Sequence, residues 1–349
     1  MAVKTALVCE TQVPFVRGGA ELLVEQLVAE LRARGVTTDR VSLPFKWYPK
    51  DEILPHAAAW RMLDLSESNG RPVDLIIGTK FPTYFARHPK KVCWLVHQHR
   101  AVYELCGTSF ADFEHTEHDV ALRDRIMALD EQMLAECAGL YTISQTVTAR
   151  LQNYSGLAST PLYHPPLIAP RLKPGGSYGS YVLSVARLER NKRVELTVAA
   201  VQHFPPGISL VVVGDGTHRS DVERIAEESG MAHRITFLGA VSDDTLVELY
   251  RDALALVYVP FDEDYGLVTL EAFLAEKPVI TAHDSGGTLE FVEDGANGYV
   301  VVPDSKEIAD AVAKLAADRT LAHALGHNGR EIAAKISWDH VVERLLSHG

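Results

Sequence analysis

Apolar and polar positions alternate between two patterns along almost the whole chain. Short runs of β-branched and other apolar residues are followed by segments in which apolar residues recur every three or four positions. This alternation is typical of repeated strand–helix–strand units, whose parallel strands are buried under helices on both faces. We therefore predict an α/β fold with doubly wound parallel sheets. The predicted strands are residues 5–9, 36–43, 74–77, 91–96 and 140–144, a strand around Leu162, and then 181–185, 210–213, 235–238, 255–259, 279–282 and 299–302.

A proline-rich segment divides these strands into two series. Residues 164–176 read HPPLIAPRLKPGG, with four prolines and two glycines, which exclude a helix or a central strand. We therefore predict a linker there, between a Rossmann-like domain at residues 1–168 and a second one at 169–330. Residues 331–349 are predicted to form a terminal helix, because Trp338 and the apolar residues after it keep helical spacing.

Composition and charge narrow the class of protein. The chain has 349 residues, 47% of them apolar and 23% charged, with a net charge of −12. This composition predicts two folded domains, and the negative charge disfavours nucleic acid as a partner. No apolar run has the length of a signal peptide or a membrane span, so a cytoplasmic location is expected. The charges of residues 51–68 are mixed in sign, so peripheral membrane contact is only weakly supported.

Two glycines precede the first predicted helix. Gly18 and Gly19 end a long loop after the first strand, where they permit close backbone approach and leave helix-start amides facing a phosphate. The loop lacks the G-x-G-x-x-G pattern of dinucleotide-binding proteins, which argues against a dehydrogenase. A plain turn made by two glycines is an equally good interpretation of this loop taken alone.

Two loops of the second series carry charges suited to a sugar phosphate. ARLERNKR follows the strand at 181–185 and presents Arg187 and Lys192, which could neutralise a diphosphate leaving group. After the strand at 255–259, Glu263 and Glu271 flank Gly266, where a helix is predicted to begin. Amides at that helix start could bind phosphate and the two carboxylates could bind sugar hydroxyls. A solvated basic loop and an acidic helix cap are the alternatives.

A histidine follows the predicted strand at 91–96. His97 begins the sequence HQHR and could hydrogen-bond a sugar hydroxyl or orient an acceptor. A structural histidine is the alternative, and His99 competes with it for the same role. The four cysteines have neither zinc nor disulfide spacing, so no metal is expected. Metal binding by the histidines is the alternative, although they lack the helical spacing of a zinc site.

Seven motifs occur in a fixed order. They are GGAE at 18–21, the segment 185–193, GDG at 214–216, FLG at 237–239, the segment 263–271, PVI at 278–280, and Gly286–Gly287 followed by Glu290. This series resembles that of the retaining glycosyltransferases of family 4, which have the GT-B fold: two Rossmann-like domains facing a central cleft. The resemblance implies a metal-independent hexosyltransferase without a cofactor. Its donor would be a nucleotide-diphosphate sugar, most simply of UDP or GDP, and its acceptor a carbohydrate or a lipid-linked molecule.

The resemblance also assigns roles to residues. Arg187 and Lys192 would bind the diphosphate, Glu263 the donor sugar and Glu271 the ribose. The remaining implied contacts are the amides of Gly266, Leu267 and Val268 to phosphate, Gly214 and Leu238 beside the nucleotide, and Gly18, Gly19 and His97 from the first domain. Asp264 and Tyr265 stand where many relatives have Gly-Phe, so the donor-sugar pocket is expected to differ. The terminal helix would return to the first domain.

Two other functions fit the same fold. A nucleotide-sugar 2-epimerase would use the same phosphate-binding loops without an acceptor site. A catalytically silent sugar-nucleotide-binding module would keep the fold and lose the reaction. The presence of both basic residues and both glutamates together favours the transferase.

Overall fold

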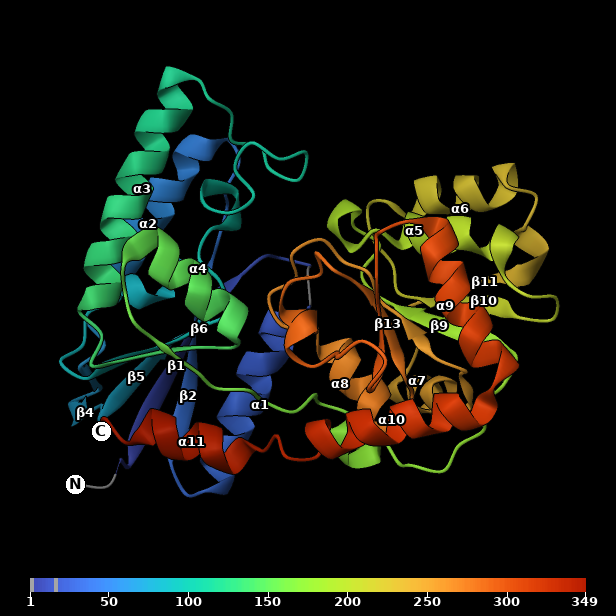
Figure 1. Ribbon diagram of the computed structural model, residues 1–349. Helices are drawn as coiled ribbons and strands as arrows, with labels where there is room; N and C mark the ends of the chain where they lie inside the picture. Colours follow the sequence, from blue (N-terminus) through green and yellow to red (C-terminus); the bar gives the residue numbers. More distant parts are fainter. Residues whose placement is uncertain (1–2, 16–17) are drawn as a thin grey trace. The chain divides into compact units, whose positions relative to one another are not determined.

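The computed structural model describes residues 3–15 and 18–349, which form two compact units (Figure 1). The first unit comprises the chain up to His164 together with Ser337–Gly349, and the second comprises Pro165–Ile336. The sequence predicted the boundaries after residues 168 and 330. The second boundary lies later because helix α10 (Arg319–Ala333) packs on helix α8 (Leu267–Leu274) and keeps residues 331–336 in the second unit.

The first unit is built on a six-stranded parallel sheet. Its strands occur in the order β2-β1-β5-β6-β7-β8, and their register places Thr5 opposite Thr37 and Ile76 opposite Lys91. The strand bounds are β1 Thr5–Gln12, β2 Thr37–Pro44, β5 Leu75–Gly78, β6 Lys91–Leu95, β7 Gly139–Thr142 and β8 Thr160–Pro161, with a separate hairpin of β3 Glu67–Ser68 and β4 Arg71–Pro72. The central strands β5 and β6 are buried throughout, as parallel strands between helical layers should be.

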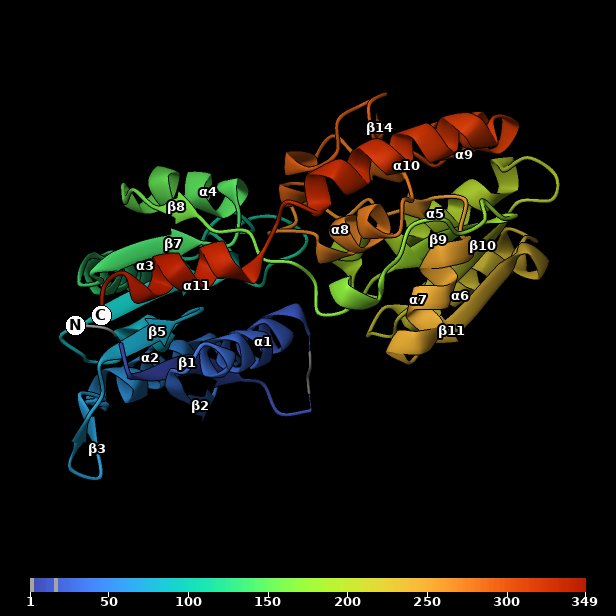
Figure 2. The ribbon, with the colours of Figure 1, turned by 90° about the horizontal axis from the view of Figure 1, so that it is seen from below.

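Helices cover both faces of this sheet. Right-handed crossovers place α1 on one face and α2, α3 and α4 on the other. Helix α11 packs beside α1 (Figure 2). The ring of Trp338 in α11 contacts that of Trp94, with ring centroids 5.8 Å apart. The helix bounds are α1 Gly19–Ala33, α2 Ile53–Met62, α3 Glu117–Ala135, α4 Gln145–Ser155 and α11 Trp338–Leu346, and short 3-10 turns include η2 Thr83–Phe85 and η3 Arg100–Val102.

The second unit repeats the architecture with its own sheet. The strands lie in the order β11-β10-β9-β12-β13-β14, all parallel, which is the strand order of dinucleotide-binding Rossmann folds. Helices α5, α6 and α9 pack together on one face, and α8 and α10 pack together on the other. The bounds are β9 Tyr181–Val185, β10 Ser209–Val213, β11 Ile235–Gly239, β12 Leu256–Val257, β13 Val279–Ala282, β14 Gly298–Val301, α5 Val194–Ala200, α6 Arg219–Glu228, α7 Asp243–Asp252 and α9 Ser305–Ala317, with 3-10 turns η5 Arg190–Lys192 and η8 Gly287–Glu290.

Strand order creates a switch point in each sheet. A switch point is a pair of neighbouring strands whose following connections cross opposite faces of the sheet. In the first sheet this pair is β1 and β5, and in the second sheet it is β9 and β12. Ligands of doubly wound folds bind at such points, beside the carboxyl ends of the strands. The candidate residues that follow β1, β9 and β12 therefore lie where the topology favours a site. Across residues 3–15 and 18–349, no helix combines the length and the apolar character that a bilayer crossing requires.

Candidate functional site

The switch point of the second sheet brings two of the predicted loops together. Lys192 follows β9 and Glu263 follows β12, and their side chains form an ion pair. The Lys192 Nζ also lies 3.4 Å from the hydroxyl of Tyr258. Side-chain exposures of 12% and 14% show that this pair is largely shielded from water, which strengthens its electrostatic interaction.

Arg187 differs from Lys192 in having no carboxylate partner in the part of the chain that the structure describes. It is exposed and lies two residues after the end of β9. Within the described residues it makes no hydrogen bond or ion pair. Burial, and next the charge of Glu263, raise the pKa of Tyr258 well above its ordinary value, while the charge of Arg187 acts in the opposite direction. Arg187 therefore lies close enough to this cluster to contribute an uncompensated positive charge.

The start of α8 supplies donors beside these cations. Gly266 is the N-terminal cap residue with φ of +79°, and a Cβ there would lie 2.7 Å from the Thr288 hydroxyl. Leu267 and Val268 begin the helix, where backbone amides have no intrahelical acceptor. The buried hydroxyls of Thr269 and Thr288 also find no hydrogen-bond partner among the described residues. This helix start can therefore accept an anion.

Glu271 lies one turn into α8, as expected. Its Oε2 accepts a hydrogen bond of 2.8 Å from the hydroxyl of Tyr250. Burial raises the pKa of Glu271 to about 7, against the smaller opposing effect of the Tyr250 hydrogen bond. The carboxylate is therefore held in one orientation and can still accept further hydrogen bonds.

Arg193 holds the loops of this site together, and sequence reasoning did not single it out. Its guanidinium binds both carboxylate oxygens of Asp284 at 2.8 and 2.6 Å and donates to the carbonyl oxygens of Val259 and Pro260 at 2.8 and 2.7 Å. These partners belong to the loops after β12 and β13, and Arg193 itself belongs to the loop after β9. Burial alone would raise the pKa of Asp284, but hydrogen bonds and charge from Arg193 hold it below its usual value.

Glycines fix the backbone around Glu263. The amide of Gly287 donates to the carbonyl oxygen of Glu263 at 2.7 Å, and a Cβ on Gly286 would lie 2.5 Å from that same oxygen. Any larger residue at position 286 would push the Glu263 backbone away. The motif Gly286–Gly287 thus positions a carboxylate that belongs to a different loop.

Several other predicted residues of the second unit contribute to its packing. Gly214 has a φ of +126° and lies against the backbone carbonyl of Ala186. A Cβ at position 214 would lie closer to that carbonyl oxygen than van der Waals contact allows, so a larger residue would overlap it. Tyr265 is buried and packs edge-to-face on Phe291, with ring centroids 5.5 Å apart. Asp264 is buried beside it, whereas Leu238 of β11 is 40% exposed. The roles of these residues toward a donor stay predictions.

In the first unit, Gly18 and Gly19 begin α1 at the switch point between β1 and β5. Glu21 accepts a hydrogen bond of 2.9 Å from the Gly18 amide at the helix start, and it also accepts one of 2.7 Å from Lys80 Nζ. Lys80 follows β5, so the pair joins the two loops of this switch point. Residues 16 and 17 of the predicted glycine loop lie outside the described residues.

The two candidate histidines have different surroundings. His97 is half-buried, and its Nδ1 lies 2.6 Å from the carbonyl oxygen of Gln98. His99 packs on the rings of Phe45, Phe81 and Phe113 at 5.7–6.3 Å, and burial lowers its pKa to about 4. His99 therefore remains neutral inside an aromatic cluster. Residues 3–15 and 18–349 contain no group of three His, Cys, Asp or Glu side chains arranged to hold a metal ion.

Comparison with known proteins finds a family match within the second unit, and it also finds curated relatives and solved structures of similar fold. Residues 177–332 match the family described as "Glycosyl transferases group 1". The D-inositol 3-phosphate glycosyltransferase of Nocardia farcinica is 36% identical over 177 residues, covering 47% of this chain and 39% of that protein. A GDP-mannose-dependent alpha-(1-6)-phosphatidylinositol monomannoside mannosyltransferase of Mycobacterium tuberculosis is 36% identical over 178 residues, covering 47% and 46%. The chain thus spans less than half the length of these curated relatives.

Solved structures match over nearly the whole chain. Sucrose-phosphate synthase from Thermosynechococcus elongatus has a TM-score of 0.74 at 21% identity and covers 98% of this chain and 97% of its own. HepE of Anabaena, in complex with UDP and glucose, has a TM-score of 0.71 at 17% identity and covers 99% and 100%. At these identities the likeness establishes the fold, which is GT-B, as the sequence motifs predicted.

Proposed function

We propose that the protein is a retaining glycosyltransferase, because residues 177–332 match the family described as "Glycosyl transferases group 1". It transfers a hexosyl unit from a nucleotide-diphosphate sugar to a carbohydrate or lipid-linked acceptor, without a metal ion. The observation that carries this proposal is the convergence of Arg187, Lys192, Glu263 and the start of α8 at one switch point.

The charges of this cluster suit a diphosphate. Arg187 and Lys192 supply two cations, and α8 supplies unpaired amides at its positive end. Together these groups stabilise the charge that develops on the leaving phosphate as the glycosidic bond breaks. Such side chains and amides perform the task that a bound metal ion performs in other phosphate sites, which supports a metal-independent reaction.

The Lys192–Glu263 ion pair connects donor binding to sugar recognition. A diphosphate that binds Lys192 competes with the Glu263 carboxylate for the same ammonium group. Glu263, freed in part, can then accept hydrogen bonds from the sugar hydroxyls, while Glu271 accepts one from the ribose. The leaving phosphate oxygen takes the proton of the attacking acceptor hydroxyl on the same face of the sugar, so no protein nucleophile is required.

The names of the relatives support a UDP or GDP donor. One curated relative is described as GDP-mannose-dependent, and HepE was crystallised with UDP-glucose. Two relatives are described as acting on an inositol phosphate and on a phosphatidylinositol mannoside, which supports a hydroxylated, phosphate-bearing or lipid-linked acceptor. A location in the cytoplasm is proposed with this function, since nucleotide sugars are made there.

Calorimetry with UDP and GDP tests the donor site directly. We expect one of them to bind the protein in the presence of EDTA, and Lys192→Ala to weaken that binding at least tenfold. Arg190→Ala is the matched control, because it removes an exposed cation from the same turn, η5. Absence of binding by both diphosphates, or equal loss in the two variants, contradicts the proposal. Product analysis by NMR then separates a transferase from an epimerase, which would change the donor sugar without an acceptor.

A further inference from the structure

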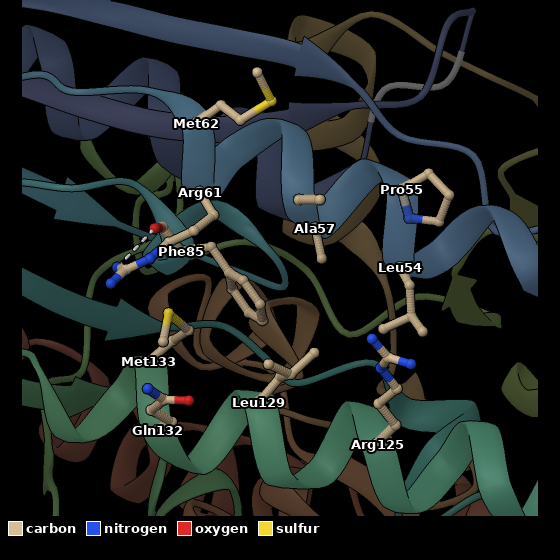
Figure 3. A pocket seen from close by; sticks show the side chains of 11 residues that line it. Leu54, Pro55, Ala57, Arg61, Met62, Phe85, Arg125, Leu129, Gln132 and Met133 are labelled. Carbon is tan, nitrogen blue, oxygen red and sulfur yellow. Dashed lines mark hydrogen bonds between the residues drawn. The ribbon is translucent and has the colours of Figure 1, made fainter.

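Between α2 and α3 the first unit contains a cavity that is separate from every candidate site residue. Its volume is about 620 Å³, within the range of small-molecule pockets. Apolar side chains from three elements form its body: Leu54 and Ala57 of α2, Phe85 of η2, and Leu129 and Met133 of α3. Figure 3 shows Leu54, Phe85 and Leu129 converging on the space between the two helices. An apolar body of this kind suits an aliphatic chain.

The described lining of the cavity contains two arginines and no acidic residue. Arg61 is already paired, since its two terminal nitrogens bind Glu136 at 2.8 and 2.9 Å. Glu136 in turn lies 3.1 Å from the buried Lys91, so this single carboxylate serves two cations. Glu136 therefore offsets the charge of Arg61, and Arg125 is the remaining charged residue of the described lining.

Arg125 is the second arginine, and it is exposed. The α3 residues three and four positions away from it are Ala121, Leu122, Ala128 and Leu129, which cannot form helical ion pairs. Across residues 3–15 and 18–349 it makes no hydrogen bond or ion pair. Its guanidinium extends from α3 toward Leu54, at one end of the cavity (Figure 3). An unpaired guanidinium at the end of an apolar cavity provides a site for a carboxylate or phosphate.

We propose that this cavity binds a single-chain anionic amphiphile. Its aliphatic tail lies among Leu54, Phe85, Leu129 and Met133, and its carboxylate or phosphate head pairs with Arg125. Each methylene buried among these side chains should raise affinity roughly fourfold, and the head fixes the orientation of the tail. A cation would be repelled by Arg125, and a sugar nucleotide would leave its hydroxyls unpaired against the apolar lining. The proposal is independent of the glycosyl-transfer function.

Calorimetry with monomeric decanoate tests the site, with decanol as the uncharged probe of equal tail length. We expect saturable decanoate binding, weaker decanol binding, and an affinity for decanoate at least tenfold lower in Arg125→Gln. Arg71→Gln, on the exposed hairpin strand β4, removes an equal charge away from the cavity and should change the affinity less than twofold. Leu129→Trp fills the cavity and should abolish binding, with far-UV circular dichroism confirming that each variant is folded.

Three results would overturn the proposal. Decanol that binds as tightly as decanoate removes the role of the head group, and unchanged binding by Arg125→Gln removes the role of that residue. The third result concerns a membrane surface as the occupant. If the full chain floats with phosphatidylglycerol vesicles but takes up no monomeric decanoate, the apolar side chains of α2 serve a lipid surface and the cavity is not a ligand site.

Discussion

Replacement of Arg193 by alanine should destabilise the second unit strongly. The side chain is 11% exposed, and it donates two hydrogen bonds to Asp284 and two to backbone carbonyl oxygens. Its loss leaves a carboxylate that is only 27% exposed without its counter-charge. Breaking such a shielded pair costs about 3–5 kcal/mol in the free energy of unfolding. Asp284 keeps a lowered pKa in the folded state, so the pair stabilises the protein above the unfolded pKa near 4 and this contribution fades as the pH falls further.

The distribution of tryptophan makes the Arg193 experiment specific. All four tryptophans, at positions 47, 60, 94 and 338, lie in the first unit. Urea unfolding followed by tryptophan fluorescence therefore reports the first unit, whereas far-UV circular dichroism reports both. Arg193→Ala should lower the transition seen by circular dichroism and leave the fluorescence transition in place. A double-mutant cycle with Asp284→Asn should give a coupling free energy above about 1 kcal/mol. A total loss below about 1 kcal/mol, or a coupling near zero, refutes the assigned role.

Three further predictions concern the second unit. Lys192→Ala should lower kcat/KM about 30- to 1000-fold, which corresponds to about 2–4 kcal/mol of transition-state stabilisation, while Arg190→Ala should stay within about twofold in the same kinetic assay. The pKa of Glu271 is about 7 in the folded state and near 4.3 in the unfolded state, so its burial destabilises the unit increasingly as the pH rises between these values. In urea titrations, Glu271→Gln should therefore lose less stability between pH 5 and pH 7.5 than the unmodified protein. Equal losses of stability in the variant and the unmodified protein would contradict this prediction. Gly266→Ala should lower the free energy of unfolding by about 1–3 kcal/mol, because the residue has a positive φ and its Cβ would crowd the Thr288 hydroxyl. Gly230→Ala is the control, since Gly230 has a φ of +70° but no atom near its Cβ position, and it should cost less.

Apolar runs predicted where most strands lie, but they could not predict strand length at the sheet centre. Residues 255–259 are apolar throughout, yet β12 comprises only Leu256–Val257, because it pairs with β9 at one position and with β13 at two. Hydrophobicity reports burial, and a buried segment need not stay paired. Strand order was also beyond reach, since it depends on the direction of each crossover. The terminal helix shows the same limit: its apolar face predicts packing, and only the family resemblance indicated that the first domain is its partner.

The candidate site could be predicted as a set of loops and not as a set of contacts. Sequence placed Lys192 and Glu263 in separate roles, and the structure joins them in an ion pair because their loops leave adjacent strands. Arg193 was hidden among the basic residues of ARLERNKR, where nothing local distinguishes a buried guanidinium from a solvated one. Its partner Asp284 lies more than ninety positions further along the chain, a separation that a single sequence does not reveal.

The shared anchorage at Arg193 limits how this protein can be re-engineered. One guanidinium joins the loops that follow three neighbouring strands of the sheet, β9, β12 and β13. A loop transplanted from another enzyme to change donor preference would therefore lack the matching carbonyl oxygens and carboxylate. Chimeras that exchange all three segments as a block should retain solubility, whereas single-loop grafts should misfold locally unless Arg193 and Asp284 are carried along.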